Sequence, residues 1–171
     1  MRCNCLAGLI ILFLLPSVTS GQSIWSAWDS AYSEVNVKMW MNKEIKYARE
    51  VDTGMTMGNL HHRMESIRFP AKYKKRMRPI AEETSNSIKR VYNLYGGNPN
   101  IIDMIDYEVL IEADGVTAWM PIKKELIKEL KRITRKKSKI YLYCHYLNEL
   151  LEDGRLYHHF LISELHAQQS E

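Results

Sequence analysis

Cysteine is scarce in this chain of 171 residues. The three cysteines are Cys3, Cys5 and Cys144, and the first two precede an apolar run near the N-terminus. If a leader ending at residue 20 is removed, Cys144 is the only thiol left, so no disulfide can form within the chain. The sequence also has no Asn-x-Ser/Thr glycosylation sequon. Because small secreted animal domains usually depend on disulfides, both absences favour a protein of the bacterial envelope.

Catalytic signatures are also missing. Beyond residue 20 there is no Gly-x-Ser-x-Gly, phosphate loop, His-Glu-x-x-His or Cys-x-x-Cys. We therefore expect a protein that is not an enzyme and that has no cofactor. Eight glycines and five prolines leave no room for a long flexible linker. The 46% of apolar and 26% of charged residues exclude a disordered or collagen-like chain, and the formal net charge of +4 is too small to indicate nucleic acid by itself.

The N-terminus has the form of a secretory signal peptide. Arg2 is followed by an apolar run over residues 6–15, and Val18 and Ser20 are small residues suited to a cleavage site after residue 20. The run is too short to span a bilayer, which needs roughly 20 residues. We expect a signal peptide over 1–20, a secreted or periplasmic protein, and no transmembrane segment after cleavage. A retained signal anchor is the alternative.

Residues 21–97 have mostly helical periodicity. The apolar spacing predicts helices over 24–49, 56–68 and 71–95. Pro79 predicts a break in the third, because proline cannot donate a backbone hydrogen bond. Alternating apolar residues over 35–41 leave a strand as the competing interpretation of the first. The turn-forming residues 96–99 then separate this helical half from residues 98–171.

The second half has a β pattern around one helix. Strands are predicted over 107–113, 116–120, 139–147 and 156–162. Asp114-Gly115 is a hairpin turn signal between the first two, because both residues tolerate positive φ. Pro121 suits the first turn of the helix, whose apolar stripe includes Leu126 and Leu130.

The third of these strands is apolar on both alternating faces, which is typical of a strand covered on both sides. One helix cannot cover both faces of four strands. The N-terminal helices are therefore expected to supply the second cover, so that 21–97 and 98–171 form one compact domain of the α+β class. Leu126, Leu130, Leu142 and Phe160 are expected in its core.

This order of elements resembles an OB-fold. The resemblance covers about 60 residues, from Tyr107-Glu-Val-Leu-Ile-Glu-Ala-Asp-Gly-Val-Thr-Ala-Trp-Met-Pro through Lys139-Ile-Tyr-Leu-Tyr-Cys-His-Tyr to Leu156-Tyr-His-His-Phe-Leu-Ile. It implies an antiparallel ββαββ sheet or barrel with a binding surface on its second and third strands. A first strand would have to come from 88–95 or 101–104. Without it, the alternative is a four-stranded antiparallel sheet with helices.

Two basic runs indicate where a partner could bind. One holds Lys72, Lys74, Lys75, Arg76 and Arg78, and the other has nine Lys or Arg over residues 123–139. Much of the second run is the solvent-exposed face of the predicted helix, but Arg135, Lys136 and Lys137 come after the end of its apolar stripe in the sequence. With Trp119 and Met120 they are the candidate binding residues. The expected partner is an envelope protein or an anionic glycan or lipid surface, with nucleic acid unlikely.

Two further clusters point to other chemistry. A hairpin between the last two strands would set His145 opposite residue 157 or His158, so these histidines are weak candidates for a metal site. Glu108, Glu112 and Asp114 are the acids from which a hydrolase of cell-wall or glycan material would draw. The leading hypothesis is a non-enzymatic secreted or envelope binding protein with an OB-like module. The hydrolase and, below it, a nucleic-acid binder are the alternatives.

Overall fold

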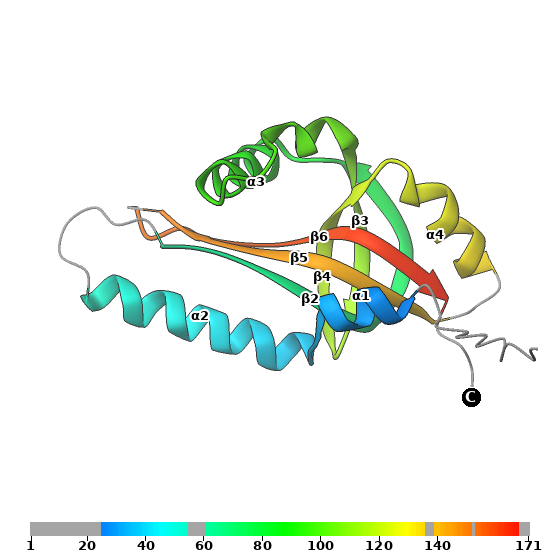
Figure 1. Ribbon diagram of the computed structural model, residues 1–171, viewed down its shortest axis with the longest axis horizontal. Coiled ribbons are helices and arrows are strands. Elements are labelled where there is room, and N and C mark those ends of the chain that lie inside the picture. Colours follow the sequence, from blue (N-terminus) through cyan, green and yellow to red (C-terminus); the bar gives the residue numbers. More distant parts are fainter. Residues whose placement is uncertain (1–24, 55–60, 136–138, 152, 168–171) are drawn as a thin grey trace, which may run out of the picture.

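The computed structural model describes residues 25–54, 61–135, 139–151 and 153–167. The predicted signal peptide over 1–20 lies outside them. The described residues form a six-stranded sheet with helices on both of its sides (Figure 1). The α+β class expected from the sequence is confirmed.

The five longer strands close partly into a ring. The strands are β1 (Ser33–Glu34), β2 (His61–Pro79), β3 (Ile105–Ala113), β4 (Val116–Lys123), β5 (Ile140–Leu150) and β6 (Leu156–Ala167). Their order is β1-β2-β3-β4-β6-β5, and β2 also pairs with β5. The β1–β2 and β4–β6 pairs are parallel, the second through Ile122 and Ile162 alone. The sheet is therefore mixed, and the expectation of a wholly antiparallel sheet was wrong.

Strand β2 is the largest departure from the sequence-based prediction. It runs for 19 residues and includes 61–68 of the helix predicted over 56–68 and the start of the helix predicted over 71–95. Residues 56–60 lie outside the described residues. Its first part, His61–Ala71, pairs with β5, and Lys72–Pro79 pairs with β3. Pairing with two strands distant in sequence outweighs the weak local helical pattern, because propensity is readily overridden by tertiary contacts. A break does occur at Pro79, but it ends the strand β2 and does not interrupt a helix.

The helices divide the chain differently from the prediction. The helix expected over 24–49 is two helices, α1 (Trp25–Ala31) and α2 (Val37–Gly54), separated by β1. The strand considered over 35–41 does not form, because α2 begins at Val37. Helix α3 (Glu82–Leu94) and the 3-10 helix η1 (Pro99–Met104) occupy the two segments proposed for a first strand, and β2 is the strand that precedes β3 instead.

The β3–β4 hairpin turns as expected at Asp114 and Gly115. Their φ values of +49° and +78° are those of a primed two-residue turn. Pro121 does not begin a helix: it lies in β4 opposite Glu108, and α4 (Leu126–Arg135) begins five residues later. Strand β4 pairs with β6 at one position only, and strands with one unpaired side tolerate proline.

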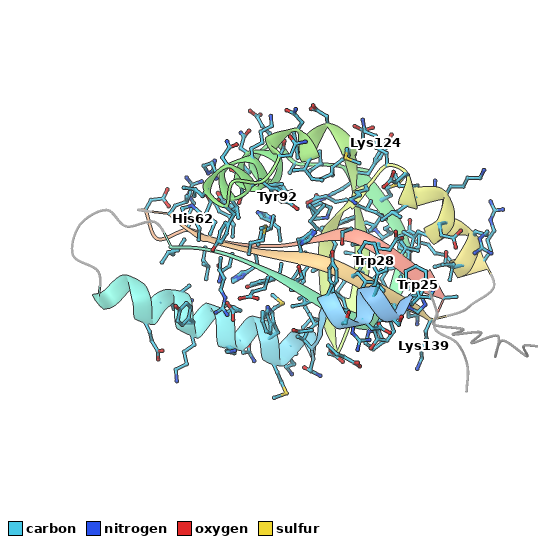
Figure 2. All side chains as sticks on the ribbon, in the orientation of Figure 1. Trp25, Trp28, His62, Tyr92, Lys124 and Lys139 are labelled. Atoms are coloured by element: carbon cyan, nitrogen blue, oxygen red, sulfur yellow. The ribbon has the colours of Figure 1, made fainter. Side chains whose placement is uncertain are left out.

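Both faces of β5 are covered, as its sequence predicted. Tyr146 faces α2 and meets the Trp40 ring edge-on at 5.8 Å between centroids. Leu147 points to the other face and packs with Ile88 and Val91 of α3. Figure 1 shows α2 and α3 on opposite sides of the extended part of β2, β5 and β6, which we call the arm (residues 61–66, 145–150 and 156–161). Tyr92 of α3 is labelled on the α3 side of the arm in Figure 2.

The main core fills the ring and continues under α4. Leu126, Leu130, Leu142 and Phe160 belong to this one cluster and are at most 7% exposed, which confirms the predicted core. None of the helices in the described part of the chain is both long and apolar enough to cross a membrane.

Candidate binding face

The second half of β2 places a row of cations on the outside of the ring. Alternation sends Phe69 and Ala71 into the ring interior and leaves the charged residues outside. The register with β3 then shifts between Tyr73 and Met77, and Lys75 adopts a φ of +57° in this irregular stretch. We define the basic face as the exposed cations of this segment with the neighbouring indole of β4: Lys72, Lys74, Lys75, Arg76, Arg78 and Trp119.

Trp119 is the aromatic centre of the basic face. Strand pairing sets Trp119 opposite Leu110 of β3, and β3 separates its strand, β4, from β2. The guanidinium carbons of Arg78 and Arg76 lie 4.4 Å and 5.6 Å from the centroid of its ring. Contacts at this distance are cation–π interactions, which hold the arginine guanidinium groups against the tryptophan ring. The half-buried indole therefore joins β4 to the cations of β2.

Two of the cations are paired with carboxylates of β3. Arg78 donates from Nε to Glu108 Oε2 at 2.7 Å, and the hydroxyl of Thr84 donates to Glu108 Oε1 at 3.3 Å. Lys74 donates to Glu112 Oε2 at 2.6 Å, and this hydrogen bond lowers the pKa of Glu112. Glu108 itself is only 2% exposed, so its charge is held against Arg78 rather than presented to solvent.

The remaining cations of the basic face carry its net positive charge. Within the described part of the chain, Lys72, Lys75 and Arg76 form no salt bridge. Lys72 also lowers the pKa of Glu112 through its charge, but less than Lys74 does. A surface with unpaired ammonium and guanidinium groups around an indole suits an anionic partner with flat or apolar parts.

The acids proposed for a hydrolase all have structural partners. Glu108 and Glu112 hold the arginine and lysine described above. Asp114 Oδ2 accepts a hydrogen bond from the backbone N–H of Val37 at 2.7 Å, at the first residue of α2. A carboxylate at a helix N-terminus is stabilised by the helix dipole. The three carboxylates therefore anchor β2, β3 and α2 to one another.

Of the other predicted binding residues, the structure describes Met120 and Arg135, and neither belongs to the basic face. Met120 is 1% exposed and packs in the ring core, so the expectation of an exposed Trp119-Met120 end is corrected for Met120. Arg135 is exposed at the end of α4. Lys136 and Lys137 lie outside the described residues.

The predicted histidine pair does not come together. His145 pairs with Leu161, and His158 pairs with Asn148, three positions further along β5. Because strand side chains alternate, His145 and His158 point to opposite faces. The hairpin predicted from sequence set His145 opposite residue 157 or His158, which is three or four positions short of its observed partner, Leu161. In the described ranges no group of three or more His, Cys, Asp or Glu is placed to hold a metal ion.

Each of these histidines is bound within the protein. His145 Nδ1 lies 3.4 Å from the Ser66 hydroxyl, and its Nε2 lies 3.3 Å from the Tyr32 hydroxyl. Burial lowers the pKa of His145. His158 Nδ1 and the Tyr146 hydroxyl share a 2.7 Å hydrogen bond, and burial lowers the pKa of His158 to about 4. Both imidazoles are therefore neutral links between elements at neutral pH.

Arg76 and Arg78 are the functional candidates that the sequence reasoning left out. Their basic run was visible, but a helix assigned from residue 71 hid its strand alternation and its proximity to Trp119. The signal that could have found them is the alternation of Ile67, Phe69 and Ala71 just upstream. Comparison with models of protein families, with curated proteins and with solved structures finds no match to this chain.

Proposed function

We propose that this chain is a non-enzymatic binding protein that holds an anionic partner on its basic face. The observation that carries the proposal is Trp119, with Arg78 at 4.4 Å and Arg76 at 5.6 Å from its ring. Among the described residues Arg76, Lys72 and Lys75 form no salt bridge. Tryptophan and arginine are the side chains that most often dominate binding surfaces. Binding here is expected to weaken as salt rises, because exposed charges are screened beyond about 8–10 Å at physiological salt.

We also propose that the ring is an OB-like barrel. Its support is the strand order β2-β3-β4-β6-β5, the parallel β4–β6 pair, and α4 between β4 and β5. If β2 takes the place of the first strand, β3 and β4 are the second and third. The resemblance assigns ligand binding to those two strands. Trp119 of the basic face belongs to β4, and Arg76 and Arg78 of β2 reach across β3 to its ring. The basic face therefore includes part of the surface that the resemblance favours.

The compartment belongs to the same proposal. A signal peptide over residues 1–20 would deliver the protein to the periplasm or outside the cell. Its anionic partner there is an envelope protein, an acidic glycan or an anionic lipid surface. The basic face suits all three because its recognition is by charge and a flat aromatic group.

The test uses salt-dependent retention on three immobilised probes: heparin, poly-glutamate and phosphatidylglycerol vesicles. The double variant Lys75→Ser/Arg76→Ser should elute at clearly lower salt than the wild type from the probe that resembles the partner. Lys128→Ser/Lys131→Ser, which removes the same charge from the exposed side of α4, is the matched control. Equal loss in both doubles would mean that net charge alone binds, and the proposal would then fail.

Two further variants locate the contact. Trp119→Ala should weaken binding without changing the charge, because flat groups of the partner could no longer stack on the indole or be buried against it. Arg135→Ser/Lys136→Ser/Lys137→Ser tests the loop that the sequence indicated. If this triple variant loses the probe while Lys75→Ser/Arg76→Ser keeps it, the binding surface is the loop and not the basic face.

A nucleic-acid binder is the second candidate, favoured by one observation. An indole flanked by two arginines is a stacking platform for bases as well as for other flat groups. An oligonucleotide of thymidines in the same salt series tests this, and Trp119→Ala should then reduce its affinity more than it reduces retention on heparin. The hydrolase alternative has less support, because Glu108, Glu112 and Asp114 are each engaged by a neighbouring group.

A further inference from the structure

A hollow lies where β2 exchanges one partner strand for the other. Ala71 is the last residue of β2 to pair with β5, and Lys72 is the first to pair with β3. The hairpin turn after β3 and the start of β5 therefore flank β2 on its two sides. Between them is a cavity of about 420 Å³. Its lining residues are Pro70, Ala71, Lys72, Glu112, Ala113, Asp114 and Lys139. Lys139, which directly precedes β5, is labelled in Figure 2.

The acids of this hollow are compensated by groups around it. Glu112 is bonded to the ammonium of Lys74, which lies outside the lining. Asp114 accepts the backbone N–H of Val37, at the positive end of the α2 dipole. The charge of Glu112 is therefore balanced by the Lys74 ammonium, and that of Asp114 by the Val37 N–H at the N-terminus of α2.

Among the described residues, the two lysines of the hollow form no hydrogen bond to a carboxylate, although Lys72 stands opposite Glu112 across the strands and its charge lowers the pKa of that carboxyl. Lys72 and Lys139 come from the two separate basic runs of the sequence and are both exposed. Among the described residues, neither forms a salt bridge. The side chains of Pro70, Ala71 and Ala113 between them are small and apolar. The hollow therefore combines two ammonium groups with an apolar floor.

We propose that this hollow binds a small phosphate monoester with an apolar body. The two charges of a phosphate monoester match the two ammonium groups, and lysine is a common phosphate ligand as a point charge. The apolar part would lie on the proline and alanine floor. The volume falls within the roughly 300–1,000 Å³ typical of small-molecule sites. The site is distinct from the centre of the basic face, because Trp119 and Arg76 do not line it.

The experiment titrates the full chain with phenyl phosphate and follows backbone amide signals by NMR. Saturable shifts are expected at Ala71 and Ala113, and inorganic phosphate and benzyl alcohol should each bind more weakly than phenyl phosphate. Lys139→Ser and Lys72→Ser should each reduce the affinity roughly tenfold, since a charge-assisted hydrogen bond contributes about that factor. Lys128→Ser on α4 is the matched control and should leave the affinity unchanged.

The outcomes separate this site from the proposed function. Lys75→Ser/Arg76→Ser should leave phenyl phosphate binding intact even where it abolishes retention on the polyanionic probes. Absence of saturable shifts in the folded wild type would overturn the proposal. So would undiminished binding in Lys72→Ser/Lys139→Ser, or equal affinity for inorganic phosphate, which would mean that the apolar floor takes no part.

Discussion

At the scale of single residues, buried charge is the feature with the clearest consequences. The Glu44 side chain of α2 is fully buried, and it pairs with Arg63, whose Nη1 lies 3.2 Å from Oε1. Within the described residues no hydrogen bond satisfies either carboxylate oxygen. Burial raises the pKa of Glu44, and Arg63 offsets this only in part. The ionised carboxylate is thus an unfavourable group in the folded protein.

Glu44→Gln is predicted to increase the free energy of unfolding at neutral pH. A carboxyl group whose pKa is raised by folding favours the folded state when protonated, and this contribution is lost as the pH rises through the folded pKa. The gain should therefore shrink below about pH 4.5, where glutamate is largely protonated in both states. Urea unfolding of wild type and variant at the two pH values measures the difference.

The control for this substitution is Glu65→Gln. Glu65 also pairs with Arg63, at 3.0 Å, but its side chain is 41% exposed. Its replacement should change stability by no more than about 0.5 kcal/mol. If Glu44→Gln instead destabilises the protein at neutral pH, the ion pair with Arg63 outweighs the burial of the carboxylate.

Leu142→Ala is the second prediction at this scale. Leu142 is fully buried in the ring core beside Phe160 and Leu165. Removing three carbons from such a site should reduce the free energy of unfolding by about 2–5 kcal/mol, through lost burial and the cavity left behind. Denaturant melts measure it. A loss below about 1 kcal/mol would contradict the packing of β5 against β6 described above.

At the scale of elements, Asp114 connects the β3–β4 hairpin to α2. It adopts positive φ in the turn and accepts the Val37 N–H with its carboxylate. Asp114→Ala loses both contributions and should reduce stability by about 1–2 kcal/mol. Asp114→Asn tolerates the same φ and keeps an oxygen acceptor, so it should lose less.

Thermal or urea unfolding of the two variants distinguishes the turn from the cap. If Asp114→Ala and Asp114→Asn are equally destabilising, the charge at the α2 N-terminus dominates. If neither changes stability by more than about 0.5 kcal/mol, the contact with Val37 contributes nothing measurable.

At the scale of the whole molecule, the arm makes stability depend on pH. His158 and His159 of β6 lie on opposite faces of the arm, and burial lowers the pKa of each to about 4. In the unfolded chain both histidines have a pKa of about 6.5. The unfolded state therefore binds more protons between these values, and stability is lost as the pH falls from about 6.5 towards 4.

The expected loss is on the order of 3 kcal/mol for each fully shifted histidine. Urea unfolding at several pH values between neutral and acid measures it, with buffer ionic strength held constant. His159→Gln should flatten the pH profile, because the unfolded state then gains one proton fewer. An unchanged profile in this variant would show that other groups cause the acid sensitivity.

The ring and the basic face are also properties of the whole molecule. Strand β2 pairs with β5 through one half and with β3 through the other, so a segment of the predicted helical half completes the β half. The same exchange of partner strands places the cations of β2 beside Trp119 of β4, and the hollow lined by Lys72 and Lys139 lies where it occurs. Neither surface exists in a single element.

The sequence by itself determined the features that depend on neighbouring residues. These include the Asp114-Gly115 turn, the break at Pro79, the amphipathic helix α4 and the two-faced burial of β5. Each follows from local backbone preference or from periodicity, which are properties of a short segment.

Tertiary structure decided everything that depends on strand pairing across the chain. The helical interpretation failed over residues 61–68 because β2 is stabilised by β3 and β5, whose residues no local pattern of 61–79 reveals. The His145–His158 pair failed because hairpin register is set by the turn, and a shift of its centre changes every partner. Trp119 was identified from sequence, but its arginine neighbours became visible only when β2, β3 and β4 were placed side by side.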